Sequence, residues 1–142
     1  MPLSDDRKIE LLAAMPLFEG VAADDLKGIA GRTIEADYGP RAVVERQGEI
    51  GTGFFVIVSG AVRVVRDGET VAQLGPGEFF GELSVLDQRP RNAQVEALVP
   101  TTCLALASWD LEGVITEHPR VALAMLRVLA KRLRDLSDVH RH

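Results

Sequence analysis

Hydrophobic and polar positions follow a short period through the middle of the chain and a helical period at both ends. Between residues 32 and 107, short runs rich in β-branched residues are separated by glycine-containing turns, which is typical of strands. Asp67-Gly68, between VRVVR and ETVAQL, predicts a two-residue hairpin turn. The predicted strands span residues 33–38, 42–46, 53–59, 61–66, 70–74, 92–99 and 101–107.

The N-terminal segment predicts two short helices. Ser4 is expected to cap the first helix, which has to end before Pro16 because proline breaks the helical ladder. The second helix is expected over residues 22–30, with Gly31 as its end.

The C-terminal segment is again helical in pattern. Ser108 is expected to cap a short helix that Trp109 anchors to the strands, and Pro119 is expected to begin the last helix. Alternating steps of four and three residues in that helix predict a heptad seam. The seam could pack on the chain's own strands or on a second subunit, and the pattern leaves both open. Its residues are Ala122, Leu126, Leu129, Leu133 and Leu136.

Together these patterns predict a mainly β fold with flanking helices. Many short strands without a crossover helix between them favour a double-stranded β-helix, or jelly-roll barrel, over a parallel sheet. The expected organisation is a single domain over residues 1–142, with helices over 1–31, the barrel over 32–107 and helices, including a long last one, over 108–139.

Composition narrows the classes of function. The 142 residues carry a net charge of −5 with a pI near 5.2, which argues against direct nucleic-acid binding by this chain. No apolar run reaches the roughly 20 residues that span a bilayer, and the charged N-terminus lacks a signal-peptide core, so the cytoplasm is the expected location. Cys103 is the sole cysteine and lies in an apolar strand, which indicates a packing role. No residues are spaced as a metal site or as a nucleophile with its base, so no enzymatic activity is expected.

The segment GEFFGELSVLDQRPRNAQVEA, residues 77–97, carries the candidate chemistry. Gly81 lets a ligand approach the main chain, Glu82 can accept hydrogen bonds from hydroxyls, and Arg91 can bind a phosphate. The start of a short helix after Gly81 would offer unpaired N–H groups to the same phosphate. From residue types alone, a surface ion pair between Glu82 and Arg91 is as good an interpretation as a sugar-phosphate site.

The string FGELSVLDQRPRNAQVEA resembles the phosphate-binding cassette of the cyclic nucleotide-binding domain family. The upstream run RQGEIGTGFFVIVSGAVRVV, residues 46–65, resembles the family's other signature, and the two occur in the family's order. The resemblance covers nearly the whole chain and includes the sensor domains of catabolite activator-type regulators and of kinase regulatory subunits. The cassette positions that match are Phe80, Gly81, Glu82, Leu83, Ser84, Pro90, Arg91, Ala93 and Val95.

The resemblance implies a role for each of these positions. Glu82 would accept from the ribose 2′-hydroxyl, and Arg91 would pair with the cyclic phosphate. Main-chain N–H groups around Leu83, Ser84 and Asn92 would complete the phosphate site, beside Gly81 and Ala93. In the last helix, Arg132 and Ser137 lie where a residue covering the base could reach it, although a solvated helix surface is the more common use of such side chains.

The expected ligand is cAMP, with cGMP as the alternative, and no other cofactor is expected. Asn92 stands where the family associates threonine with cGMP preference, and Gln94 is bulkier than the usual residue, so these two positions bear on the base. The expected function is a sensor whose ligand shifts the C-terminal helices toward a partner or second subunit. The alternatives are the sensor part of a catabolite activator-type transcription regulator without its DNA-binding domain, and an interaction module that binds no ligand.

Overall fold

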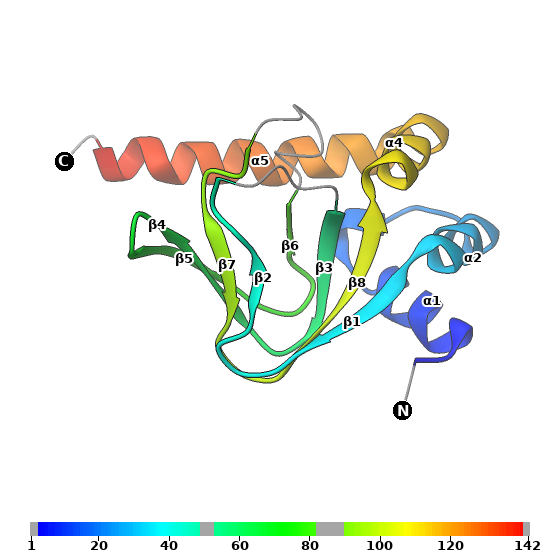
Figure 1. Ribbon diagram of the computed structural model, residues 1–142. Helices are drawn as coiled ribbons and strands as arrows, with labels where there is room; N and C mark the ends of the chain where they lie inside the picture. The colour runs from blue at the N-terminus through cyan, green and yellow to red at the C-terminus, as the bar shows by residue number, and fades with distance from the viewer. Residues whose placement is uncertain (1–2, 49–52, 82–89, 141–142) are drawn as a thin grey trace.

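Two four-stranded antiparallel sheets form the centre of the molecule and face each other as a sandwich (Figure 1). The structure is a computed structural model that describes residues 3–48, 53–81 and 90–140, the last four for their backbone alone. One sheet has the order β1-β8-β3-β6 and the other β2-β7-β4-β5. The strands are β1 (Ile34–Tyr38), β2 (Val43–Glu45), β3 (Gly53–Ser59), β4 (Val62–Arg66), β5 (Glu69–Leu74), β6 (Phe79–Phe80), β7 (Gln94–Ala97) and β8 (Thr101–Ala107).

Helices cover one sheet and one end of the sandwich. Figure 1 shows α1 and α2 beside the β1-β8-β3-β6 sheet, and the long α5 running across one end of both sheets. The helices are α1 (Asp5–Ala13), α2 (Ala23–Arg32), α4 (Ser108–Glu117) and α5 (Pro119–His140), with a 3-10 turn over Pro16–Phe18. The expected fold, a mainly β jelly roll with helices before and after the strands in the sequence, is therefore confirmed.

Alternation along β3 divides the core into two parts. Phe54 and Val56 point toward the helices and pack with Leu104, Leu106 and the buried residues of α1, α2, α4 and α5. Ile57 points the other way, into the space between the sheets, where it meets Cys103 and Val95. This second, smaller core fills the space between the two sheets, and it includes Phe80, the residue before Gly81.

Several local predictions are confirmed. Ser4 caps α1, since its hydroxyl accepts a hydrogen bond from the Arg7 N–H at 3.1 Å. Asp67 and Gly68 both have positive φ, 52° and 83°, as a tight primed hairpin turn requires. Pro119 begins α5.

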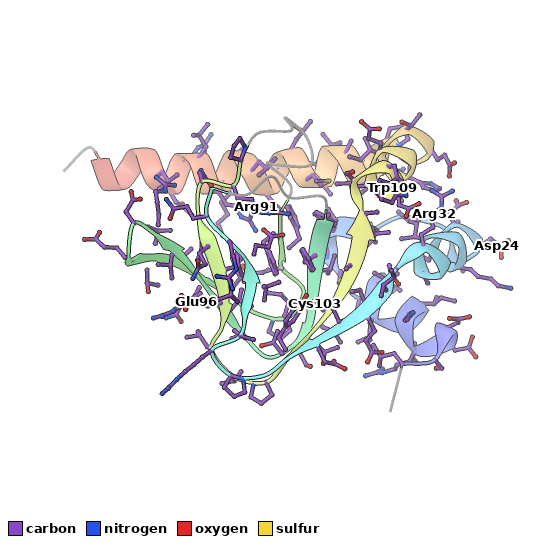
Figure 2. All side chains as sticks on the ribbon, viewed as in Figure 1. Asp24, Arg32, Arg91, Glu96, Cys103 and Trp109 are labelled. Atoms are coloured by element: carbon purple, nitrogen blue, oxygen red, sulfur yellow. The ribbon has the colours of Figure 1, made fainter. Side chains whose placement is uncertain are left out.

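Three local predictions are wrong. Gly31 lies inside α2, which runs to Arg32, so it does not end the helix. Ser108 is the first residue of α4 and caps nothing, because Ala107 holds the cap position without a side-chain hydrogen bond. Trp109, which is labelled in Figure 2, is 69% exposed and does not anchor α4. The helix buries Leu111 instead.

Among the described residues, no helix combines the length and the apolar character that crossing a bilayer requires.

Candidate functional site

Arg91 is buried because it continues the inward alternation of β7. Arg91, Ala93, Val95 and Ala97 are all buried, while the residues between them are partly or fully exposed. Since side chains alternate between the two faces of a strand, Arg91 shares the inward face with the core residues that follow it. An arginine that is only 9% exposed requires partners for its charge and its N–H groups.

The guanidinium of Arg91 joins three segments at one end of the sandwich. Its Nη1 forms a salt bridge with the carboxylate of Glu45, the last residue of β2. Its Nη2 donates to the Gly53 carbonyl at the start of β3, at 2.9 Å. Nη1 also donates to the Gly81 carbonyl at 3.4 Å, just beyond β6. Figure 2 shows Arg91 at the end of the sandwich that α5 crosses.

Glu45 is a site residue that the sequence reasoning missed. Its side chain is 5% exposed and that of Arg91 is 8% exposed, so the pair is an internal one. The surface ion pair between Arg91 and Glu82, left open above, does not describe Arg91, whose charge is buried against Glu45. The sequence does show a glutamate directly after the apolar run Ala42-Val43-Val44. Since a glutamate at the end of a strand is ordinarily exposed to solvent, this position did not indicate a buried carboxylate.

Gly81 fits the site because it has no side chain. Its φ is +91°, a region that other residues rarely adopt. A Cβ at this position would lie 2.6 Å from the Gly53 carbonyl oxygen, 3.0 Å from Glu45 Oε1 and 3.2 Å from Arg91 Nη1. The glycine therefore lets the main chain pass directly against the Arg91–Glu45 pair.

The main chain of Arg91 is fixed as well as its side chain. The Gly48 N–H donates to the Arg91 carbonyl at 2.8 Å. The preceding residue, Gln47, exchanges two hydrogen bonds with Asp67 in the β4–β5 turn, at 2.9 and 3.1 Å. Hydrogen bonds thus connect the main chain of Arg91, through Gln47 and Gly48, to the turn between β4 and β5.

The other predicted ligand-binding residues divide into three groups. Ala93 is buried and lies on the same inward face as Arg91, whereas Asn92 is exposed and lies on the opposite face. Glu82, Leu83 and Ser84, with the short helix expected there, lie outside the described residues. Their roles stay predictions from the resemblance.

The two predicted lid residues lie on α5. The Nη2 of Arg132 donates to the Phe79 carbonyl at 2.7 Å, and its guanidinium carbon lies 4.8 Å from the centre of the Phe79 ring. Phe79 belongs to β6, which leads directly into Gly81. Arg132 therefore fastens α5 to the strand that enters the site. The side chain of Ser137 lies outside the described residues, and base contact by either residue stays a prediction.

Cys103 lies inside the sandwich and is fully buried. Burial, with smaller contributions from Asp37 and Glu45, raises the pKa of its thiol to about 12. Because the thiolate is the reactive form, this cysteine is a poor nucleophile. Among the residues described, no group of three or more His, Cys, Asp or Glu side chains could hold a metal ion.

One end of the sandwich holds a buried guanidinium that is paired with Glu45 and lies against the main chain of Gly81. The N–H fork of a guanidinium matches the geometry of phosphate oxygens. The geometry thus places a group with the right chemistry for an anion at this end of the sandwich.

Comparison with known proteins identifies the kind of domain. The sequence profile of the cyclic nucleotide-binding domain matches residues 35–118. The Cyclic AMP receptor protein of Thermus thermophilus is 35% identical over 125 residues, which cover 84% of this chain and 58% of that protein. The crystal structure of the Thermus thermophilus catabolite activator protein superposes with a TM-score of 0.79 at 35% identity, over 88% of this chain and 61% of that chain.

Two further relatives belong to different kinds of protein. A cyclic nucleotide-gated potassium channel of Mesorhizobium japonicum is 34% identical over 120 residues, or 82% of this chain and 32% of the channel. The cAMP-dependent protein kinase regulatory subunit of Schizosaccharomyces pombe is 35% identical over 101 residues, or 70% of this chain and 24% of the subunit. This chain thus spans less than two thirds of each of these relatives. The profile match extends over well more than half of the chain and includes both Arg91 and Gly81. This chain therefore belongs to the cyclic nucleotide-binding domain family.

Proposed function

We propose that this domain is a non-catalytic sensor that binds a 3′,5′-cyclic nucleotide, cAMP in preference to cGMP, at the end of the sandwich where Arg91 is buried. The observation that carries the proposal is the position of Arg91, a buried cation next to Gly81 in a segment that resembles the family's phosphate-binding cassette. The named relatives are a receptor protein, a channel and a kinase subunit. What they share with this chain is the ligand-binding domain, which supports ligand binding as the function to test.

In the proposed complex, the guanidinium of Arg91 binds the cyclic phosphate and Glu82 accepts from the ribose 2′-hydroxyl. Main-chain N–H groups near Leu83, Ser84 and Asn92 complete the phosphate site. The absence of a threonine at position 92 favours cAMP, and two of the named relatives carry cAMP in their names. The base would lie toward α5, where Arg132 and Ser137 are the candidate lid residues.

Isothermal titration calorimetry with cAMP, cGMP and 5′-AMP tests the proposal. We expect saturable binding of cAMP that is at least about tenfold tighter than that of cGMP, a difference of about 1.4 kcal/mol. 5′-AMP serves as the control, because it keeps the base and ribose but lacks the cyclic phosphodiester. A folded protein that gives no heat with either cyclic nucleotide at millimolar concentration would refute the proposed function.

Signal output would pass through α5. Arg132 on this helix donates a hydrogen bond to the carbonyl of Phe79, two residues before Gly81. A movement of the chain around Gly81 would therefore change a contact that holds α5. A ligand can shift the helix only if it binds two helix arrangements with different affinity. The inner face of α5 packs Val121 and Met125 into the core, both less than 9% exposed.

The proposed second subunit would pack on the heptad seam. Leu126, Leu133 and Leu136 are 61%, 67% and 51% exposed, and Ala122 and Leu129 are partly exposed, so the seam lies apart from the buried face of α5. Exposed leucines at heptad spacing fit a helix–helix contact between two copies of this chain.

Charge at the seam should prevent the dimer. In Leu126→Glu/Leu133→Glu, two carboxylates would be buried against the partner helix, so sedimentation equilibrium should show a monomer where the wild-type chain is a dimer. Lys131→Glu is the matched control, because it adds a carboxylate to an exposed position of α5 outside the seam. A wild-type chain that remains monomeric at all accessible concentrations would exclude this role for the seam.

A further inference from the structure

The cation proposed to bind the phosphate already has a carboxylate from its own chain. Glu45 forms a salt bridge with Nη1 of Arg91, and both side chains are more than nine-tenths buried. A second nitrogen of the same guanidinium, Nη2, is engaged by the Gly53 carbonyl at 2.9 Å. A phosphate that approaches Arg91 therefore has to compete for N–H groups that already donate to Glu45 and Gly53, and it is repelled by the negative charge of Glu45.

Two anions on one buried guanidinium repel each other strongly, because the protein interior screens charge weakly. The backbone carbonyls of Gly53 and Gly81, which also face the guanidinium, add partial negative charge and supply no donor to the phosphate. Binding of a phosphate would then weaken the salt bridge between Glu45 and Arg91 or displace the carboxylate.

We propose that Glu45 is an internal counter-anion that competes with the ligand's phosphate for Arg91 and so lowers the affinity of the ligand-free domain. This inference rests on the proposed function, because it assigns a regulator of that same site. It differs from a merely structural role, in which Glu45 would hold Arg91 in place for the ligand.

The two roles predict effects of opposite sign on affinity. Removing the charge of Glu45 takes from the buried guanidinium the counter-charge that Glu45 supplies, which destabilises the ligand-free fold under either role. A bound phosphate would restore a counter-charge in the variant, whereas in the wild-type chain it adds a second one. If Glu45 competes with the phosphate, a variant without its charge should be less stable without ligand but should bind the ligand more tightly. If Glu45 has only a structural role, both the stability and the affinity of the variant should decrease.

Glu45→Gln separates these outcomes, since glutamine keeps the volume and one acceptor oxygen but not the charge. Titration of wild-type and Glu45→Gln protein with cAMP should show at least about tenfold tighter binding by the variant, as expected for a close buried charge pair. Melting without ligand should show a lower Tm for the variant. Glu96→Gln is the matched control, because Glu96 pairs with the half-exposed Arg63 in the same sheet, and its affinity should not change.

The possible failures are distinguishable. Wild-type protein that binds cAMP together with a Glu45→Gln variant that binds equally or more weakly overturns the inference and leaves the proposed function intact. Absence of binding by both proteins overturns the proposed function. If Glu45→Gln is unfolded without ligand, cAMP should restore a cooperative melting transition, and failure to do so while the wild-type chain binds also overturns the inference.

Discussion

Arg91→Ala is expected to remove most cAMP binding and much of the stability of the domain. A phosphate that loses a charge-assisted partner in a buried site should bind more weakly by about 2 kcal/mol or more. The same substitution leaves the Glu45 carboxylate, whose side chain is 5% exposed, without its guanidinium. Breaking a buried pair by removing one member costs about 3–5 kcal/mol of unfolding free energy. Calorimetric titration and urea denaturation measure the two effects separately.

Arg91→Lys separates binding from folding. Lysine keeps a positive charge near Glu45, so most of the stability should remain, but its single ammonium cannot reproduce the guanidinium fork that contacts Glu45 and Gly53 and would bind two phosphate oxygens at once. Arg63→Ala is the control, because Arg63 is 43% exposed in its pair with Glu96 and such pairs contribute only about 0–1 kcal/mol. Wild-type affinity in a folded Arg91→Lys protein would place the phosphate elsewhere.

The strands that were predicted well are those specified by local chemistry. The runs 53–59 and 101–107 have the bounds expected from their pattern, because the first ends at Ser59-Gly60 and the second ends where the helical pattern of α4 begins. The turn at Asp67-Gly68 follows from the two residue types that tolerate positive φ. In contrast, β6 has only two residues, Phe79 and Phe80, and exists through its pairing with Phe55 and Val56. A strand too short to show a period has no local signal.

The site shows the same division between local and distant causes. The residue type and the cassette motif both indicated Arg91, and the alternation along β7 explains its burial. Glu45 was not indicated, because its direction depends on an irregularity in the pairing of β2 with β7. Val43 pairs with Glu96 and Glu45 pairs with Val95, so the register shifts between them and the carboxylate faces the buried Val95 row. A one-residue register shift changes which face a side chain takes, and it is fixed by the partner strand.

Trp109 illustrates the limit of reasoning from residue type. A large aromatic residue at the start of a helix was expected to anchor it, yet the helix buries Leu111 and Val114 and leaves Trp109 69% exposed. Which face of a short amphipathic helix packs inward is decided by the surface it meets, here β8 and β3, and not by the size of its largest side chain.

Gly81→Ala is expected to weaken cAMP binding without removing any charged group. A residue with a Cβ at φ +91° carries backbone strain of about 1–3 kcal/mol. The added carbon would also lie 2.6 Å from the Gly53 oxygen, and main-chain oxygen cannot move aside as a flexible side chain can. Since Gly53 and Gly81 both accept from Arg91, the shift would misplace the guanidinium. We expect at least about a tenfold loss of affinity, or about 1.4 kcal/mol, in calorimetric titration.

Gly77→Ala distinguishes crowding at the site from backbone strain alone. Gly77 has a φ of +86°, and a Cβ there would meet no atom within 4 Å, so the variant carries a similar conformational cost without the contact. Both variants should therefore lose stability in urea denaturation, but only Gly81→Ala should lose affinity. If the two variants bind cAMP equally well, the close approach of the main chain at Gly81 is not what holds Arg91 for the phosphate. If only Gly81→Ala binds weakly, the loss of affinity is specific to the position beside the Arg91–Glu45 pair and does not follow from positive-φ strain in general.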